Sequence, residues 1–168
     1  QTCALPICFD IANLLLDRAR KDGLAFYFFG SQEEVGKLAK KNVEKMYPGV
    51  KIVGTHSGYF SENDDIASII AEANPDIIFV CLGAGKQEKW IYDNAPRLSG
   101  KALLGIGGSL DVFAGTVKRA PDIFIKLNLE WFYRLIKQPQ RFIRMLALPR
   151  FILSVTGYRL KHGKGKSL

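Results

Sequence analysis

The sequence has few of the residues from which metal centres and disulfide frameworks are built. Among 168 residues it contains three cysteines, Cys3, Cys8 and Cys81, and two histidines, His56 and His162. Their spacing matches neither a zinc pattern nor a disulfide framework, and scattered cysteines are typical of a reducing compartment. We therefore expect no metal, no cofactor and a cytoplasmic protein, with His56 structural or exposed.

Long hydrophobic runs are also lacking. The longest candidate, MLALPRFILSV at 145–155, contains Pro149 and Arg150 and is well short of the roughly 20 apolar residues that cross a bilayer. The sequence therefore predicts no membrane-spanning helix.

Acidic residues are absent from the stretch 131–168, which holds nine lysines and arginines. The rest of the chain holds fifteen basic and sixteen acidic residues, so the net charge of +8 comes from a basic tail on a nearly neutral body. Such a tail indicates an anion-binding element, for which phosphates, anionic lipid or nucleic acid are the candidates. We expect a basic amphipathic appendage over 129–158 and a disordered basic tail over 159–168.

What the chain does have is a regular alternation of short apolar runs with segments of helical periodicity. The predicted strands are LAFYFFG (24–30), KIVGT (51–55), DIIFVCLG (76–83) and KALLGIGG (101–108). This alternation predicts an α/β fold over 8–128, with an open, mostly parallel, Rossmann-like sheet and flanking helices. Because each run ends in glycine and ligands bind beyond the carboxyl ends of such strands, we expect the site at that edge.

The helix expected after the first strand has two local signals. Ser31 and Glu34 form a capping-box pattern at its start. Five apolar residues then share one helical face, which is expected to be buried: Val35, Leu38, Ala39, Val43 and Met46.

The first motif with chemical content is CLGAGKQEKW at 81–90. Gly83 and Gly85 predict a tight strand-to-helix turn, with Lys86, Gln87 and Glu88 in the first helical turn. Amides and a lysine in this position suit a phosphate or sugar hydroxyls. The motif lacks the third glycine of a dinucleotide fingerprint and the spacer of a P-loop. A glycine turn followed by a solvated, charged helix start is the alternative.

The second motif is GIGGSLDVFAGTVKRAP at 105–121. Gly107 and Gly108 end the fourth strand, and Asp111 follows one turn later. Asp111 could accept hydrogen bonds from a ribose or a nucleobase, or could simply be a charge favoured near a helix N-terminus. Arg119 lies in KRAP, where a loop of solvated charges is the alternative.

The third motif is LEWFYRLIKQPQRFIRML at 129–146. Arg134, Arg141 and Arg144 share a face if the helix continues through Pro139, and three arginines can grip a diphosphate bidentately. A basic amphipathic helix without a ligand, or one that binds anionic lipid, would have the same composition.

In this order the three motifs resemble the WecG/TagA/CpsF family of bacterial glycosyltransferases, over about Asp10 to Val155. The matching stretches are GAGKQE, GGSLDVFAGTVKRAP and LEWFYRLIKQPQR, with Gly85 where the family often has proline. The resemblance implies a metal-independent, inverting transfer of N-acetylmannosamine, or a related hexosamine, from a UDP-sugar donor. The implied acceptor is a sugar on a polyprenyl diphosphate at the inner face of the cell membrane, in teichoic-acid or other surface-polysaccharide synthesis.

The resemblance also implies roles for individual residues. Gln87 falls at an active-site glutamine and Asp111 at a nucleotide-contacting aspartate, while the three arginines fall on an appendage that closes over the site and meets the membrane. The expected substrate-binding residues are Gly83, Lys86, Glu88, Gly107, Gly108, Asp111, Arg119, Arg134, Arg141 and Arg144. The implied partners are the UDP-sugar, the lipid-linked acceptor and an anionic membrane surface. A second copy of the chain is a further candidate partner, and we expect no nucleic acid.

Family members carry a further α/β segment before the equivalent of Asp10, including an aspartate proposed as the general base. Residues 1–7, QTCALPI, can be encoded by a sequence that resembles a common sequencing-adapter oligonucleotide. We expect these seven residues to be translated adapter, with Cys8 at the junction, and the chain to be inactive by itself.

A non-catalytic module that binds a nucleotide or an anionic membrane remains the alternative function. Release of UDP from a UDP-hexosamine, measured beside sedimentation with liposomes, discriminates between the two.

Overall fold

The computed structural model describes residues 8–61 and 64–117, together with 121, 127, 151, 154–156 and 158. Contacts divide the chain into two compact units, Gln1–Arg119 and Ala120–Leu168. The described residues at 151, 154–156 and 158 are helical. The rest of the predicted appendage, the predicted tail and residues 1–7 lie outside the described residues.

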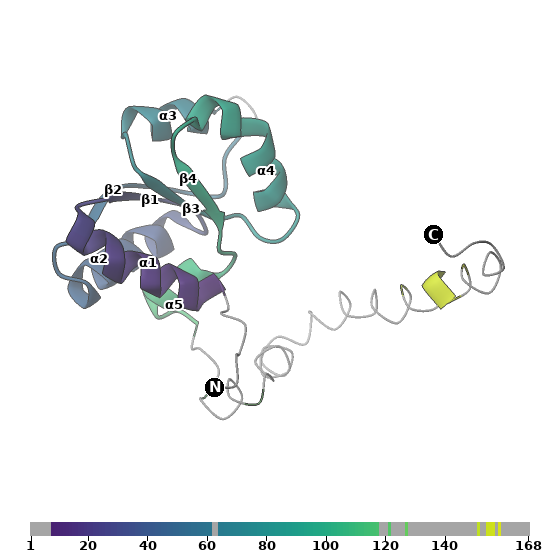
Figure 1. Ribbon diagram of the computed structural model, residues 1–168, viewed down its shortest axis with the longest axis horizontal. Helices are drawn as coiled ribbons and strands as arrows, with labels where there is room; N and C mark the ends of the chain where they lie inside the picture. Colours follow the sequence, from purple (N-terminus) through teal and green to yellow (C-terminus); the bar gives the residue numbers. More distant parts are fainter. Residues whose placement is uncertain are drawn as a thin grey trace, which may run out of the picture. The chain divides into compact units, whose positions relative to one another are not determined.

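The first unit is built on a sheet of four parallel strands, as the sequence predicts (Figure 1). The strands are β1 (Ala25–Gly30), β2 (Lys51–His56), β3 (Ile77–Cys81) and β4 (Ala102–Gly105). They lie in the order β2-β1-β3-β4, and each neighbouring pair is parallel. The expected open, Rossmann-like α/β sheet is confirmed.

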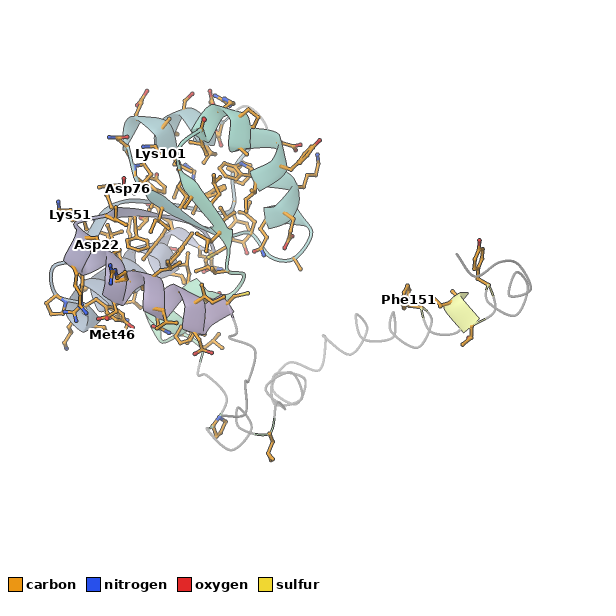
Figure 2. All side chains as sticks on the ribbon, in the orientation of Figure 1. Asp22, Met46, Lys51, Asp76, Lys101 and Phe151 are labelled. Atoms are coloured by element: carbon orange, nitrogen blue, oxygen red, sulfur yellow. The ribbon has the colours of Figure 1, made fainter. Side chains whose placement is uncertain are left out.

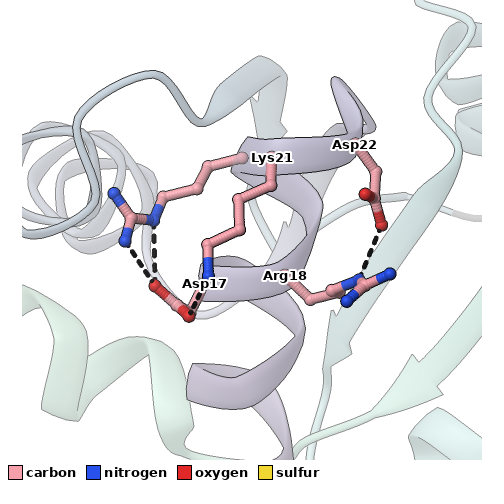
Figure 3. A network of polar contacts seen from close by, with 5 residues as sticks. Asp17, Arg18, Lys21 and Asp22 are labelled. Atoms are coloured by element: carbon pink, nitrogen blue, oxygen red, sulfur yellow. Dashed lines mark hydrogen bonds and ion pairs between the residues drawn. The ribbon is translucent and has the colours of Figure 1, made fainter.

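Helices cover both faces of this sheet (Figure 1). The helices are α1 (Cys8–Asp22), α2 (Glu33–Met46), α3 (Ile66–Glu72), α4 (Lys86–Asn94), the short 3-10 helix η1 (Ala95–Leu98) and α5 (Ser109–Ala114). One buried cluster joins α1, α2 and α5 to the sheet, and a second joins α3, α4 and η1 to its other face. The outer face of α1 carries charged side chains, among them the Arg18–Asp22 pair at 2.9 Å (Figure 3).

The alternation of side chains along β1 explains why its sequence is apolar throughout. Phe26 and Phe28 enter the cluster with α1, α2 and α5, whereas Tyr27 and Phe29 enter the cluster with α3 and α4. Successive side chains of a strand point to opposite faces, so a strand covered on both faces has no solvent-facing position to fill with a polar residue.

Two expectations about α2 are wrong. Its N-cap is Gln32, which makes no side-chain capping hydrogen bond, so Ser31 and Glu34 form no capping box. Leu38 and Met46, expected on the buried face, are 41% and 53% exposed. The helix buries Ala39 and Val43 of the predicted face together with Gly36, so its buried stripe is narrower than the apolar pattern predicts.

The order in which strands are added to the sheet reverses at β1. The connection after β1 leads to β2 on one side, and β3 then pairs with the other side of β1. Gly30 at the end of β1 is in register with Cys81 at the end of β3. In open parallel sheets a crevice forms beyond the carboxyl ends of the strands at this reversal, and ligands bind there.

The opposite, amino edge of the sheet is closed by its own polar groups. Figure 2 labels Lys51, Asp76 and Lys101, which lie at the starts of β2, β3 and β4. The Asp76 carboxylate accepts a hydrogen bond from the Ala25 amide at 2.8 Å, and Lys101 donates to Asn74 at 2.6 Å. These contacts satisfy groups that an anionic ligand would otherwise use.

We predict that the contact between Arg97 and Asp65, the N-cap of α3, makes a pH-dependent contribution to stability. Arg97 donates to the Asp65 carboxylate at 2.7 Å, and this hydrogen bond is the largest cause that lowers the pKa of Asp65 to about 2. A depressed carboxyl pKa stabilises the fold above the ordinary value of 3.8, and the contribution is lost as the pH falls toward 2.

The stability difference between the wild type and Arg97→Ala should therefore shrink as the pH falls through this window. Urea unfolding of both proteins at several pH values measures it. A difference that stays constant across the window would contradict this role of Arg97.

Candidate functional site

The predicted glycine turns after β3 and β4 are present. Gly83, Gly85 and Gly107 have φ angles of 87°, 85° and 56°, in the left-handed region that side chains with a Cβ rarely adopt. Gly85 is the N-cap of α4, and Lys86 is its first residue, as predicted from the motif. Both turns lie at the carboxyl edge of the sheet.

Gln87 connects the two turns. Its side chain is only 7% exposed, and its Oε1 accepts a hydrogen bond from the Gly107 amide at 3.1 Å. Its Nε2 donates to Glu88 Oε1 at 2.9 Å, and the other oxygen of Glu88 accepts from the Gly85 amide at 2.5 Å. The structure therefore brings the first and second motifs together through side chains that both belong to the first.

The hydrogen bond between Glu88 and the Gly85 amide bears on which ligand could bind at the start of α4. The Glu88 carboxylate binds the Gly85 amide, and the hydrogen bond from Gln87 is the largest cause that lowers the pKa of Glu88. An ionised carboxylate at this place repels a phosphate and accepts hydrogen bonds from hydroxyl groups. At the Gly85 amide, sugar hydroxyls therefore fit better than phosphate, whereas the Lys86 side chain lines the cavity described below.

Asp111 reaches the end of β1. It lies in α5, is half-buried, and accepts a hydrogen bond from the Ser31 hydroxyl at 3.2 Å. The C-terminal end of α5 is held by Asn42 of α2, whose side-chain amide donates to the carbonyls of Phe113 and Ala114 at 3.0 and 3.2 Å. The position of Asp111 is thus fixed from both sides.

Ser31 has a strained backbone, with φ of 58° in a residue that is not glycine. Its amide donates to the Cys81 carbonyl at 3.3 Å, and its carbonyl accepts from the Gly58 amide at 2.8 Å. These bonds to the ends of β3 and to the loop after β2 hold the residue in place. Strained residues that the surrounding structure holds in this way cluster at functional sites.

A cavity of about 580 Å³ opens where β1 and β3 end. It is lined by Ser31, Gly58, Tyr59, Phe60, Cys81, Leu82, Lys86, Lys89, Trp90 and Asp93. Its volume is within the range of pockets that hold small ligands.

The lining of this cavity combines aromatic rings with cations. Tyr59 is 78% exposed, and the Trp90 ring packs 4.7 Å from that of Phe29. Lys89 is paired with Asp93 at 2.9 Å, whereas Lys86 forms no ion pair with any residue that the structure describes. Aromatic faces stack on nucleobases and lysines bind phosphates, so this lining suits a nucleotide.

Cys81 lies at the cavity but is not suited to nucleophilic chemistry. Burial raises the pKa of its thiol far above the ordinary value, and the nearby Asp111 carboxylate raises it further. The thiol is therefore protonated at neutral pH, and only a thiolate is a strong nucleophile.

The other predicted site residues divide into two groups. Gly108 adjoins Asp111, since a Cβ added to it would lie 3.6 Å from Asp111 Oδ2. Arg119, Arg134, Arg141 and Arg144 lie outside the described residues, so their roles stay predictions. Within 8–61 and 64–117 and the few described residues beyond, no group of three or more His, Cys, Asp or Glu side chains could hold a metal ion.

Of the ten residues that line the cavity, Lys86 alone was a predicted site residue, so Ser31 and the aromatic residues Tyr59, Phe60 and Trp90 were all missed. For Ser31 the signal was its position directly after the glycine that ends β1. The loop after β2 carries no comparable signal, because only the strand order brings it against α4.

The model of the glycosyl transferase WecG/TagA/CpsF family matches residues 7–165. The chain belongs to this family. A relative from Bacillus subtilis (strain 168) is 44% identical over 159 residues, which are 94% of this chain and 60% of the relative. A Bacillus spizizenii relative is 36% identical over 159 residues, with coverage of 95% and 60%, and one from Staphylococcus aureus (strain MRSA252) is 36% identical over 140 residues, with coverage of 83% and 55%.

All three relatives are named N-acetylglucosaminyldiphosphoundecaprenol N-acetyl-beta-D-mannosaminyltransferase. The chain spans between 55% and 60% of their length. Among the residues described for this family member, no helix combines the length and the apolar character that crossing a membrane requires.

Proposed function

We propose that the chain is part of a glycosyltransferase that moves N-acetylmannosamine, or a related hexosamine, from a UDP-sugar to a polyprenyl-diphosphate-linked sugar. The observation that carries the proposal is the aromatic and cationic cavity at the carboxyl ends of β1 and β3, where the strand order reverses, in a member of a glycosyltransferase family. The names of the relatives support the acceptor and the transferred sugar. The pathway would be the synthesis of teichoic acid or another surface polysaccharide.

In this proposal the donor nucleotide occupies the cavity. The uracil stacks against the aromatic side chains of Tyr59, Phe60 and Trp90, and Lys86 binds a phosphate. Glu88 and Asp111 lie outside the phosphate position, because their carboxylates would repel it. Asp111 accepts a hydrogen bond from the ribose, and Glu88 faces the hydroxyl groups of the transferred sugar, which UDP lacks.

The chemistry then requires positive charge on the departing diphosphate and a base that takes a proton from the acceptor hydroxyl. We propose Arg134, Arg141 and Arg144 for the first task, with Arg119 beside them, and we assign no residue of this chain to the second. The basic stretch 131–168 would hold the protein at the anionic inner face of the cell membrane, where a lipid-linked acceptor is found.

Calorimetric titration of the chain with UDP, UMP and uridine tests the donor site. We expect affinity to rise with each phosphate, with UDP at least about tenfold tighter than uridine, because a hydrogen bond to a charged group contributes about 1.5–3 kcal/mol. Equal affinities, or no binding of UDP, would contradict the proposal. Release of UDP from UDP-N-acetylmannosamine that depends on the lipid-linked acceptor, assayed in a longer relative, separates transfer from simple binding.

A further inference from the structure

Gln87 is unusual among the predicted site residues because it is buried and both ends of its amide are occupied. Its neighbours Lys86 and Glu88 are exposed, whereas Gln87 is 7% exposed. Its oxygen accepts from the Gly107 amide, and its nitrogen donates to the Glu88 carboxylate. A donor on one side and an acceptor on the other allow only one orientation of the side-chain amide.

Glu88 extends this contact to a chain of three hydrogen bonds. The bonds run from the Gly85 amide to Glu88, from Gln87 to Glu88, and from the Gly107 amide to Gln87, at 2.5, 2.9 and 3.1 Å. They join the turn after β3, which leads into the cavity residue Lys86, to the turn after β4, which leads into α5 and Asp111.

β4 leaves space for this arrangement. A Cβ added to Gly105 would lie 2.7 Å from Gln87 Nε2 and 3.0 Å from its Cδ. A side chain at position 105 would therefore displace the Gln87 amide. The absence of a side chain at Gly105 thus provides the space that the Gln87 amide occupies.

We propose that Gln87 is a positioning residue, which together with Glu88 fixes the turn after β4 relative to the turn after β3 and so sets the place of Asp111 beside Ser31. Gln87 acts through the two turns, not through contact with the reacting atoms. This proposal rests on the proposed function only for its binding readout, because the hydrogen bonds themselves belong to the fold.

Exchange of the two side chains tests the proposal. In Gln87→Glu, two carboxylates face each other and the donor between them is lost. In Glu88→Gln, the Gly85 amide and the Gln87 amide both donate toward an amide that has one acceptor atom. In the double variant Gln87→Glu/Glu88→Gln all three hydrogen bonds form again, with one carboxylate and the original net charge.

Two measurements on the whole chain follow the exchange: the urea unfolding midpoint and the affinity for UDP. We expect each single change to lower the midpoint and to weaken UDP binding about tenfold or more. The double variant should recover the wild-type midpoint and bind UDP within about threefold of the wild type. Gly105→Ala, which displaces the Gln87 amide and leaves residues 87 and 88 unchanged, should weaken UDP binding as the single changes do.

Three results would overturn the positioning role. The first is that the single variants bind UDP and unfold as the wild type does. The second is that the double variant unfolds at a urea midpoint no higher than that of the less stable single variant. The third is a double variant that regains stability without regaining affinity, which would mean that Gln87 or Glu88 contacts UDP itself. If the wild type binds no UDP, the proposed function fails, and the midpoints alone still decide whether the hydrogen-bonded link exists.

Discussion

Replacement of Gly30 by alanine should destabilise the fold by about 3 kcal/mol or more. Gly30 ends β1 with a φ of 128°, and a Cβ at this position would lie 2.8 Å from Cys81 Cα and closer still to the Cys81 carbonyl. Because Gly30 and Cys81 are in register in the central strand pair, the clash cannot be relieved without separating β1 from β3. Backbone atoms, unlike the end of a flexible side chain, have no other rotamer to adopt.

Urea unfolding followed by circular dichroism measures this effect, and Gly36→Ala is the matched control. Gly36 lies in α2, and its added Cβ would be in ordinary contact, 3.6 Å from Thr55 Cβ. Alanine favours a helix over glycine by up to about 1 kcal/mol, so this variant should be as stable as the wild type or slightly more stable. Equal midpoints for the two variants would show that β1 and β3 are not packed as described.

Replacement of Tyr59 by alanine should weaken UDP binding by roughly fivefold to a hundredfold, the loss expected for one stacking contact of about 1–3 kcal/mol. Tyr59 lines the cavity and is 78% exposed, so its ring has few contacts with the fold to lose. The unfolding midpoint should therefore change little. Trp90 is a poorer choice for this test, because its ring also packs on Phe29 in the core.

Tyr92→Ala is the control for this experiment. Tyr92 is 83% exposed on α4 and is not among the residues that line the cavity. Loss of its ring should leave the affinity for UDP unchanged. If Tyr59→Ala and Tyr92→Ala bind UDP equally well, the nucleobase does not stack in this cavity.

The fold could be predicted because the two central strands, β1 and β3, are buried on both faces. Such strands appear in the sequence as uninterrupted apolar runs, and the glycines that end them mark the carboxyl edge of the sheet. The turn before α4 was predicted for the same kind of reason, since Gly83 and Gly85 take φ angles that other residues avoid. Each of these signals lies within a few consecutive residues, so it can be recognised without the structure.

The errors occur where distant parts of the chain determine local structure. Ser31 and Glu34 fit a capping box, but the backbone of Ser31 is held by Cys81 and Gly58, and its hydroxyl is bonded to Asp111. Tyr59 and Phe60 reach the cavity because β3 pairs with β1 and not with β2, and no local pattern specifies that order. Tertiary contacts of this kind override local preference.

Gln87 combines a signal that the sequence contains with contacts that depend on the tertiary structure. The resemblance to the family marked its position as important, whereas its hydrogen bond to Gly107 depends on the pairing of β3 with β4. Sequence reasoning could thus single out the residue but not find its hydrogen-bond partners.

Photo-crosslinking with 4-thio-UDP, followed by mass spectrometry of the digested chain, tests most directly whether the cavity holds the donor nucleotide. The account predicts that the label is attached within the loop that carries Tyr59 and Phe60, or at Trp90 of α4, and that excess UDP abolishes the labelling. Labelling at the amino edge of the sheet, beside Lys51 or Lys101, or labelling that excess UDP does not reduce, would contradict it.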